Sequence, residues 1–185
     1  MAAAQFSWPL ILQIAGLINR DFLQYLTPFG ESEPFQWFDT VALWPQNFPA
    51  ILIYEESNVF NPLSEQTFEQ DLTIRCRIQL SAVDRNILAQ SCRAYLGALT
   101  QLFAYYDWSR HASDFIAPVP LPETLIQLGT RDCNGVNTGL TPGVTAEVNR
   151  IFVARHQFDE FGPAGAGYMT RVSAFVTVNQ EESQE

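Results

Sequence analysis

The sequence contains no lysine. All ten of its basic residues are arginine, against 20 acidic residues, so the chain of 185 residues carries a net charge of −10. Proteins that bind DNA through its phosphates need clustered cations to release counterions, and this balance argues against that class. It does not exclude a surface past which DNA slides without binding. Because arginine tolerates interfaces better than lysine, two explanations stand: subunit contacts, or a biased genome composition.

Cysteine and histidine are scarce as well. The three cysteines are odd in number and widely spaced, and Cys76 and Cys92 fall on predicted core faces. We interpret them as small buried thiols rather than as a disulfide or a metal site, which fits synthesis in a reducing cytoplasm. The only histidines are His111 and His156. Without a spaced His/Cys set, we predict no metal site and no cofactor.

Patterns of catalytic residues are missing too. No serine lies in a nucleophile-elbow pattern, although Ser109–Asp114 contains a local polar cluster. Glu55 and Glu56 are adjacent on a strand, so their side chains point to opposite faces and do not share a proton. The glycine-rich run 162–167 lacks the Gly-Lys-Ser/Thr of a phosphate loop and lies between two strands. We therefore predict no catalytic residues, and a protein that is not an enzyme.

No long hydrophobic run is present either. The apolar stretch from Leu10 to Ile18 is interrupted by Gln13 and Gly16, and it is too short to span a bilayer. The start of the chain also lacks the positive charge of a secretory signal. We expect neither a signal peptide nor a membrane anchor.

What the sequence does contain is a long strand that leads into a long helix, over Gln70–Tyr106. Up to Val83, apolar and polar residues alternate as in a half-buried strand. After Asp84 the apolar residues recur at helical spacing, and Asp84 is the predicted N-cap, accepting a hydrogen bond from the Ile87 amide. Because typical strands have only ~5–6 residues, we expect part of this hairpin to project beyond the core and to add a strand to a neighbour.

The other predicted elements complete one domain over 1–178. They are a helix at Pro9–Leu26, an aromatic covering segment at 31–48, a strand at Ala50–Tyr54, a loop at Glu55–Phe68, an insertion at 107–145, a strand at Ala146–Gln157, a glycine turn at 162–167, a strand at Tyr168–Val178 and a disordered acidic tail at 179–185. The strand at Ala146–Gln157 is apolar on both faces, as in a central strand or one sealed by a partner. The order predicts an α+β fold: a four-stranded, mostly antiparallel sheet with helices packed on one face, plus the insertion.

Six residues are candidates for contacts between subunits. They are Arg75, Arg77, Arg155, Arg171, Trp37 and Trp44. The arginines occupy polar strand faces and share one face if the strands form one sheet. That face is either solvated with local ion pairs, or it meets the acidic loops of the next copy. The two tryptophans either plug into the core or anchor a neighbouring subunit.

The order of elements resembles the tail terminator proteins of tailed bacteriophages. The resemblance rests on the N-terminal helix, on Pro49–Glu56 followed by a polar loop, on Phe68–Ile78, on Asp84 with the leucine-rich helix, and on closing strands around His156–Phe158 and Tyr168–Val178. It covers roughly two thirds of the chain. The segments 31–48 and 107–145 have no counterpart in it.

This resemblance implies a hexameric ring at the head-proximal end of the tail, which ends tube polymerisation and joins the tail to the head-completion or stopper protein. The implied partners are other copies of the chain, the tail tube protein, the stopper protein and, in a contractile tail, the sheath. DNA would pass through the lumen without specific binding. The protein would be made in the host cytoplasm and located in the neck of the virion. Two alternatives stay open: another neck component, such as a connector or tube-completion subunit, and a small enzyme or ligand-binding domain with its site under 107–145.

Overall fold

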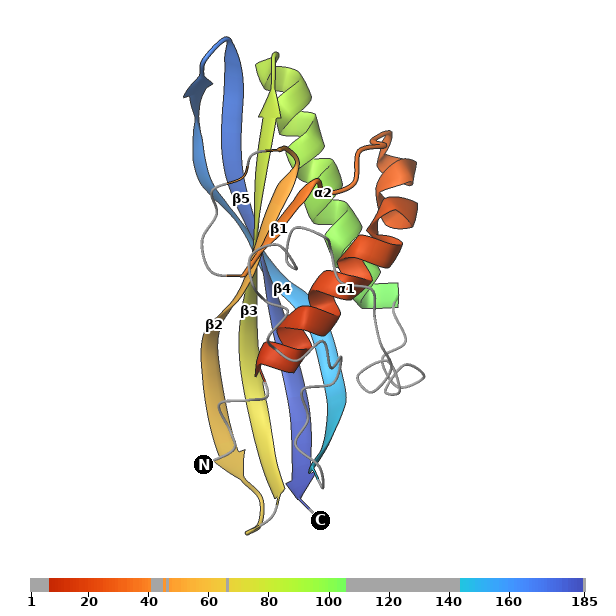
Figure 1. Ribbon diagram of the computed structural model, residues 1–185, viewed down its shortest axis with the longest axis vertical. Coiled ribbons are helices and arrows are strands. Elements are labelled where there is room, and N and C mark those ends of the chain that lie inside the picture. The colour runs from red at the N-terminus through yellow and green to blue at the C-terminus, as the bar shows by residue number, and fades with distance from the viewer. Residues whose placement is uncertain (1–6, 41–44, 46, 66, 106–143, 185) are drawn as a thin grey trace.

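The computed structural model describes residues 7–40, 45, 47–65, 67–105 and 144–184 (Figure 1). Its elements are the helices α1 (Ser7–Leu26) and α2 (Arg85–Tyr105), the 3-10 turn η2 (Thr27–Phe29), and the strands β1 (Trp37–Asp39), β2 (Ala50–Pro62), β3 (Thr67–Ala82), β4 (Val144–Ala164) and β5 (Gly167–Gln184). Neither α1 nor α2 has the length and apolarity needed to cross a membrane.

The strands form one sheet in the order β1-β2-β3-β5-β4. All neighbouring pairs are antiparallel except β1 and β2, which are parallel. The predicted α+β class and the mostly antiparallel sheet are confirmed, but the predicted number of four strands is wrong. The fifth strand is β1, in which Trp37 pairs with Ala50. A strand of three residues in a segment rich in aromatics and proline has no period that a sequence pattern can reveal.

The predicted loop at Glu55–Phe68 is wrong as well. β2 continues to Pro62, β3 begins at Thr67, and the two pair along almost their whole length with one register shift between Glu55 and Ser57. The segment is polar because it lies outside the core, where an antiparallel strand does not need an apolar face. Figure 1 shows this end of the sheet extending well beyond both helices. The expectation that the hairpin projects beyond the core is therefore confirmed.

The C-terminal strands also differ from the prediction. Residues 179–184, expected in a disordered tail, form the end of β5 and pair with β3 on one side and β4 on the other. Among the described strands β4 lies at an edge of the sheet rather than at its centre. Ile151 on one of its faces is buried in the core cluster, and sealing of the strand by a partner stays a prediction. The predicted insertion at 107–145 lies outside the described residues, apart from the first two residues of β4.

The core lies on one face of the sheet, which both helices cover. The even-numbered residues from Leu72 to Ile78 of β3 are fully buried against α1 and α2 together with their cross-strand partners on β5. On α2 the predicted stripe is also buried, with Leu88, Leu96 and Leu99 in the same cluster. The alternation on β3 and the helical period on α2 thus placed the core residues of this unit correctly.

Asp84 caps the N-terminus of α2 as predicted. Its Oδ1 accepts hydrogen bonds from the backbone amides of Asn86 at 2.7 Å and Ile87 at 3.1 Å. Asp84→Ala leaves these amides without a side-chain acceptor and is expected to lower the free energy of unfolding by ~0.5–2 kcal/mol in urea titrations. Asp84→Asn keeps an acceptor and is expected to retain most of the stability. Equal losses in the two variants would assign the effect to the charge at the helix end instead of the cap.

Cys76 and Cys92 are buried free thiols, as predicted, and Cys133 lies outside the described residues. Burial raises the pKa of Cys76 to about 12 and that of Cys92 to about 11. Because the thiolate is the reactive form, we expect neither thiol of a Cys133→Ser variant to react with a chromogenic disulfide at pH 8. Both thiols should react at once in denaturant. Rapid labelling of the folded protein would show that one of these sites opens readily.

Candidate subunit interface

The four predicted arginines share the sheet face opposite the helices. In the strand register Arg75 lies opposite Phe175, and Phe175 lies opposite Arg155 on β4. Arg77 lies opposite Ser173, and Arg171 lies opposite Gln79. We call these four residues the arginine face. Their predicted position on one common face is confirmed.

An ion cluster centred on Asp159 lies within the arginine face. Nη2 of Arg75 is 2.8 Å from Oδ1 of Asp159, and Nε of Arg75 donates a 3.0 Å hydrogen bond to Oγ of Ser173. Ser173 in turn donates to Asp159, and Nε of Arg77 lies 3.8 Å from its Oδ2. The side chains of Arg75 and Asp159 are only 12% and 13% exposed. The cluster therefore ties β3, β4 and β5 together in a largely desolvated setting.

Electrostatics favour the charged form of Arg75. Burial disfavours its charge, but the Tyr54 hydroxyl and the carboxylates of Asp159 and Glu56 outweigh this effect and raise the pKa of Arg75 above its ordinary value. The Glu56 contribution is the more exposed one, with its Oε2 3.7 Å from Nη1 of Arg75. Arg75 is thus permanently charged and held by partners in its own subunit.

On the arginine face, two guanidinium groups cover the ring of Phe175, and neither of the described helices packs against it there. The guanidinium of Arg75 lies 5.0 Å from the centre of its ring and that of Arg155 lies 3.9 Å away. Both distances are within the range of cation–π attraction. Arg155 itself is exposed, because β4 is the outermost strand. Of the arginine face, Arg155 is therefore the member that lies at the sheet edge with an exposed side chain.

The predicted interface residues have different environments in the structure. Arg75 and Arg77 fit the first alternative, local ion pairs, because Asp159 engages both. Trp37 lies half-buried on β1, and its Nε1 is buried without a hydrogen-bond partner. Trp44 lies outside the described residues. A role in subunit contacts remains a prediction for all six residues.

Sequence reasoning did not identify Asp159 as the centre of the cluster. It lies 84 positions from Arg75 along the chain. The two meet only because β3 and β4 flank β5 in one register, with a shift between Phe158 and Glu160 next to Asp159. Alternation assigns a residue to a face but leaves the register between strands open. No signal in a single sequence could have paired these two side chains.

His156 contacts helix α2 through a hydrogen bond. Its Nε2 lies 3.0 Å from Oγ1 of Thr100 on α2, while that hydroxyl donates to the carbonyl of Leu96. Oγ1 therefore accepts a hydrogen bond from His156. Burial lowers the pKa of His156, so the neutral ring is favoured. Across the part of the chain that the structure describes, no group of three His, Cys, Asp or Glu side chains is placed to hold a metal ion.

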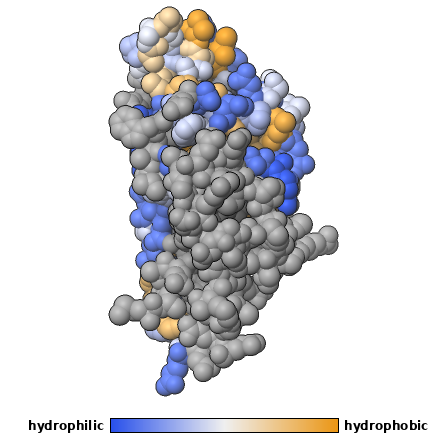
Figure 2. All heavy atoms as spheres, in the orientation of Figure 1, coloured by the Kyte–Doolittle hydropathy of each residue, from blue (hydrophilic) through white to orange (hydrophobic). Residues whose placement is uncertain are grey.

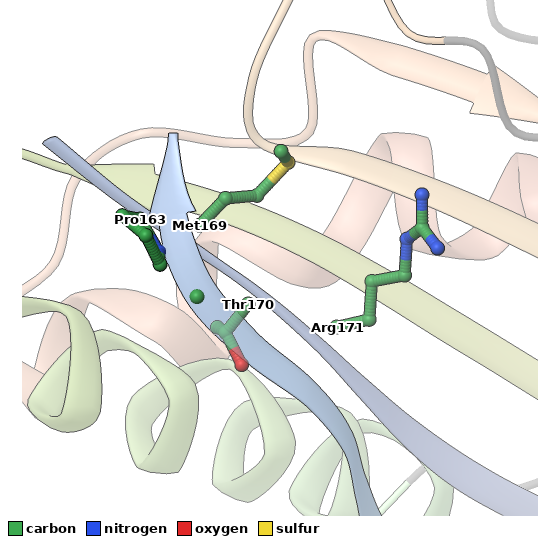
Figure 3. A pocket seen from close by; sticks show the side chains of 5 residues that line it. Pro163, Met169, Thr170 and Arg171 are labelled. Atoms are coloured by element: carbon green, nitrogen blue, oxygen red, sulfur yellow. The ribbon is translucent and has the colours of Figure 1, made fainter. Parts of the chain in front are cut away.

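A small hollow lies near the turn between β4 and β5 (Figure 3). It has a volume of about 100 Å³ and is lined by Gly162, Pro163, Met169, Thr170 and Arg171. Sites for drug-sized ligands usually measure ~300–1,000 Å³. Figure 3 shows the side chains of Met169, Thr170 and Arg171 pointing in different directions. The hollow therefore does not bring polar groups together around a ligand.

Five of the exposed apolar side chains lie on the segments at the two ends of the long axis. At the hairpin end, Val59, Phe60 and Leu63 are 55%, 43% and 57% exposed. At the opposite end, where β3 leads into α2, Val83 and Ile87 are exposed as well. Figure 2 shows hydrophobic residues at the upper end of the molecule in this view. Clustered exposed apolar groups are typical of surfaces that contact other proteins.

Comparisons with known proteins identify no family. No family model matches the chain, and no curated protein matches it. Among solved structures, a chain from the virion of a native gene transfer agent particle is similar over 95% of this chain and 98% of that chain, with a TM-score of 0.44 and 11% sequence identity. A likeness at this level assigns neither a family nor a function.

Proposed function

We propose that this protein is a structural virion subunit that caps the head-proximal end of a phage-type tail tube as a ring. It ends tube polymerisation and joins the tail to the head-completion or stopper protein. The observation that carries the proposal is the projecting end of the sheet, where β2 and β3 continue beyond both helices together with the neighbouring ends of β5 and β4 (Figure 1). This end contributes little to the core and exposes apolar side chains, as expected for a part that contacts other subunits.

Three further features support a structural role. The ion cluster on the arginine face has a largely buried carboxylate, Asp159, at its centre, and Arg75 and Ser173 both donate to it. The order of sequence elements resembles that of tail terminators. A net charge of −10 suits a ring through which DNA passes without binding. The partners of this function are other copies, the tail tube protein and the stopper protein.

Tube growth in vitro tests this function. The protein would be mixed with the polymerising tail tube protein of the same genome, and tube lengths would be measured by negative-stain electron microscopy. We expect shorter tubes that carry a ring at one end, and a hexamer in sedimentation velocity of the mixture or of the protein alone. A strict monomer that leaves the tube length distribution unchanged would contradict the proposal. Rings that bind the stopper protein but do not limit tube growth would favour a connector instead.

A further inference from the structure

The two long edges of the sheet lack a described neighbouring strand. β1 pairs only with Ala50–Leu52, so no described strand covers the outer side of β2 from Ile53 to Pro62. At the other edge, β4 pairs with β5 and with no further strand among those described. Uncovered edges present rows of free backbone amides and carbonyls, which readily pair with another chain.

The β2 edge has few of the features that normally prevent an edge strand from pairing with another chain. Natural edges are commonly blocked by lysine or other charges, proline and bulges. Here Ser57–Asn61 is regular and uncharged, and only Pro62 and the register shift before Ser57 interrupt the strand. Val59 and Phe60 point to opposite faces and are both exposed. An uncharged edge that exposes apolar side chains on both faces is suited to being covered. The exposed residues Glu55 and Glu56 precede it and give it an acidic border.

The β4 edge has the complementary character. Arg150 and Arg155 are exposed, and each guanidinium lies over an aromatic ring, Phe152 at 4.5 Å and Phe175 at 3.9 Å. Phe158 on the same strand is 65% exposed. Register shifts divide β4 into short regular runs, and one of these runs is Arg150–Val153. This edge therefore offers a short ladder flanked by two positively charged side chains.

The charges of the two edges lie at the same height on the sheet. Following the register across the strands, Glu55 aligns with Ile74, Val176 and Val153. Tyr54, one residue before Glu55, aligns in the same way with Arg155. The acidic pair on β2 thus lies level with the stretch of β4 between Arg150 and Arg155.

Strand direction is also compatible with a contact between these edges. Each of the pairs β2–β3, β3–β5 and β5–β4 is antiparallel, so β2 and β4 run in opposite directions. When copies are arranged around an axis along the strands, β4 of one copy meets β2 of the next in antiparallel orientation. Antiparallel pairs form the more favourable ladder.

We propose that copies of this chain associate edge to edge, with the acidic β2 edge of one copy against the arginine-bearing β4 edge of the next. Glu56, which lies on the same sheet face as Arg75, faces Arg150 and Arg155, while Glu55 adds negative charge on the other face of the same edge. The exposed Val59 and Phe60 are covered. Such a head-to-tail contact closes into a ring when the rotation between copies permits it. The inference rests on the proposed ring and deepens it by naming the two surfaces that form the contact. It also moves the contact from Arg75 and Arg77, which are engaged within the subunit, to the exposed arginines of β4.

Two charge-reversal variants test the contact. Glu55→Arg/Glu56→Arg makes both edges basic, and Arg150→Glu/Arg155→Glu makes both edges acidic. Each variant alone is expected to weaken self-association by ~100-fold or more in sedimentation velocity, because like charges then meet across the contact. An equimolar mixture should restore assembly as a ring in which the two variants alternate. Restoration by mixing is a result that a merely unfolded variant cannot give.

The controls separate folding from association. Arg93→Glu changes an exposed arginine on α2 and should leave assembly as in the wild type. Circular dichroism verifies the fold of each variant. Because Glu56 lies near Arg75, Glu56→Gln serves as the acidic-edge variant if the double variant fails to fold, since it removes the negative charge without placing a second cation beside Arg75.

Each result decides between the proposals. Wild-type rings that persist in both reversal variants would overturn this contact and leave the proposed function intact. Loss of assembly that mixing does not restore would also overturn the direct contact between these edges. A wild-type chain that neither forms rings nor limits tube growth would overturn both proposals.

Discussion

Asp159→Ala is expected to lower the free energy of unfolding by ~3–5 kcal/mol, the range seen when one partner of a buried ion pair is removed. The Asp159 carboxylate accepts from Arg75 and Ser173 and lies near Arg77. Without it, Arg75 keeps its charge in a site where its side chain is only 12% exposed. Equilibrium denaturation in guanidinium chloride at pH 7 measures the loss.

Two matched variants identify the cause of that loss. Glu56→Gln removes the exposed carboxylate near Arg75 and is expected to cost less than ~1 kcal/mol, as surface ion pairs do. In Arg75→Met/Asp159→Ala the stranded charge is absent, so the double variant should be more stable than Asp159→Ala. A double variant that is as unstable as the sum of both single changes would show that packing, and not the unpaired charge, controls the stability here.

The cluster changes how the arginine face relates to assembly. Sequence patterns placed four arginines on one face, and the structure shows that Asp159 engages two of them inside the subunit. Reversing Arg75 to Glu would therefore place a second carboxylate beside Asp159 and destabilise the fold itself. A loss of assembly in that variant would not report on a subunit contact. The exposed Arg150 and Arg155 on β4 avoid this problem.

The parts of the fold that could be predicted are those in which one face of an element is buried. On β3 and α2, alternation and helical period follow from that burial, and Asp84 marks the change between them. The distal half of β2 and the end of β5 lie beyond the helices, so no core imposes a pattern on them. The sequence pattern therefore predicts a loop around Asn58 and Asn61 and a disordered tail at the glutamates after Asn179. In the structure both segments are held in strands by backbone pairing.

Leu99→Ala on α2 is expected to lower the free energy of unfolding by ~2–5 kcal/mol, since truncating a buried leucine loses apolar burial and leaves a cavity. Leu99 is fully buried in the core cluster, and Leu96 one turn earlier is 3% exposed, so Leu96→Ala should behave alike. Ile87→Ala on the same helix is the matched control, because Ile87 is 56% exposed and its truncation should stay within ~0.5 kcal/mol of the wild type. If the free energy of unfolding changed by less than ~1 kcal/mol at both leucines, this apolar face of α2 would not be packed against the sheet.

The effect at Leu99 also separates folding from assembly. The leucine lies in the core, on the face of the sheet that the helices cover, and its side chain is fully buried inside the subunit. A ring held by its edges should therefore keep its subunit contacts in Leu99→Ala as long as the subunit remains folded. We expect a lower denaturation midpoint with unchanged self-association at temperatures well below unfolding. Weaker association of the folded variant would instead show that the helical layer takes part in the contact between copies.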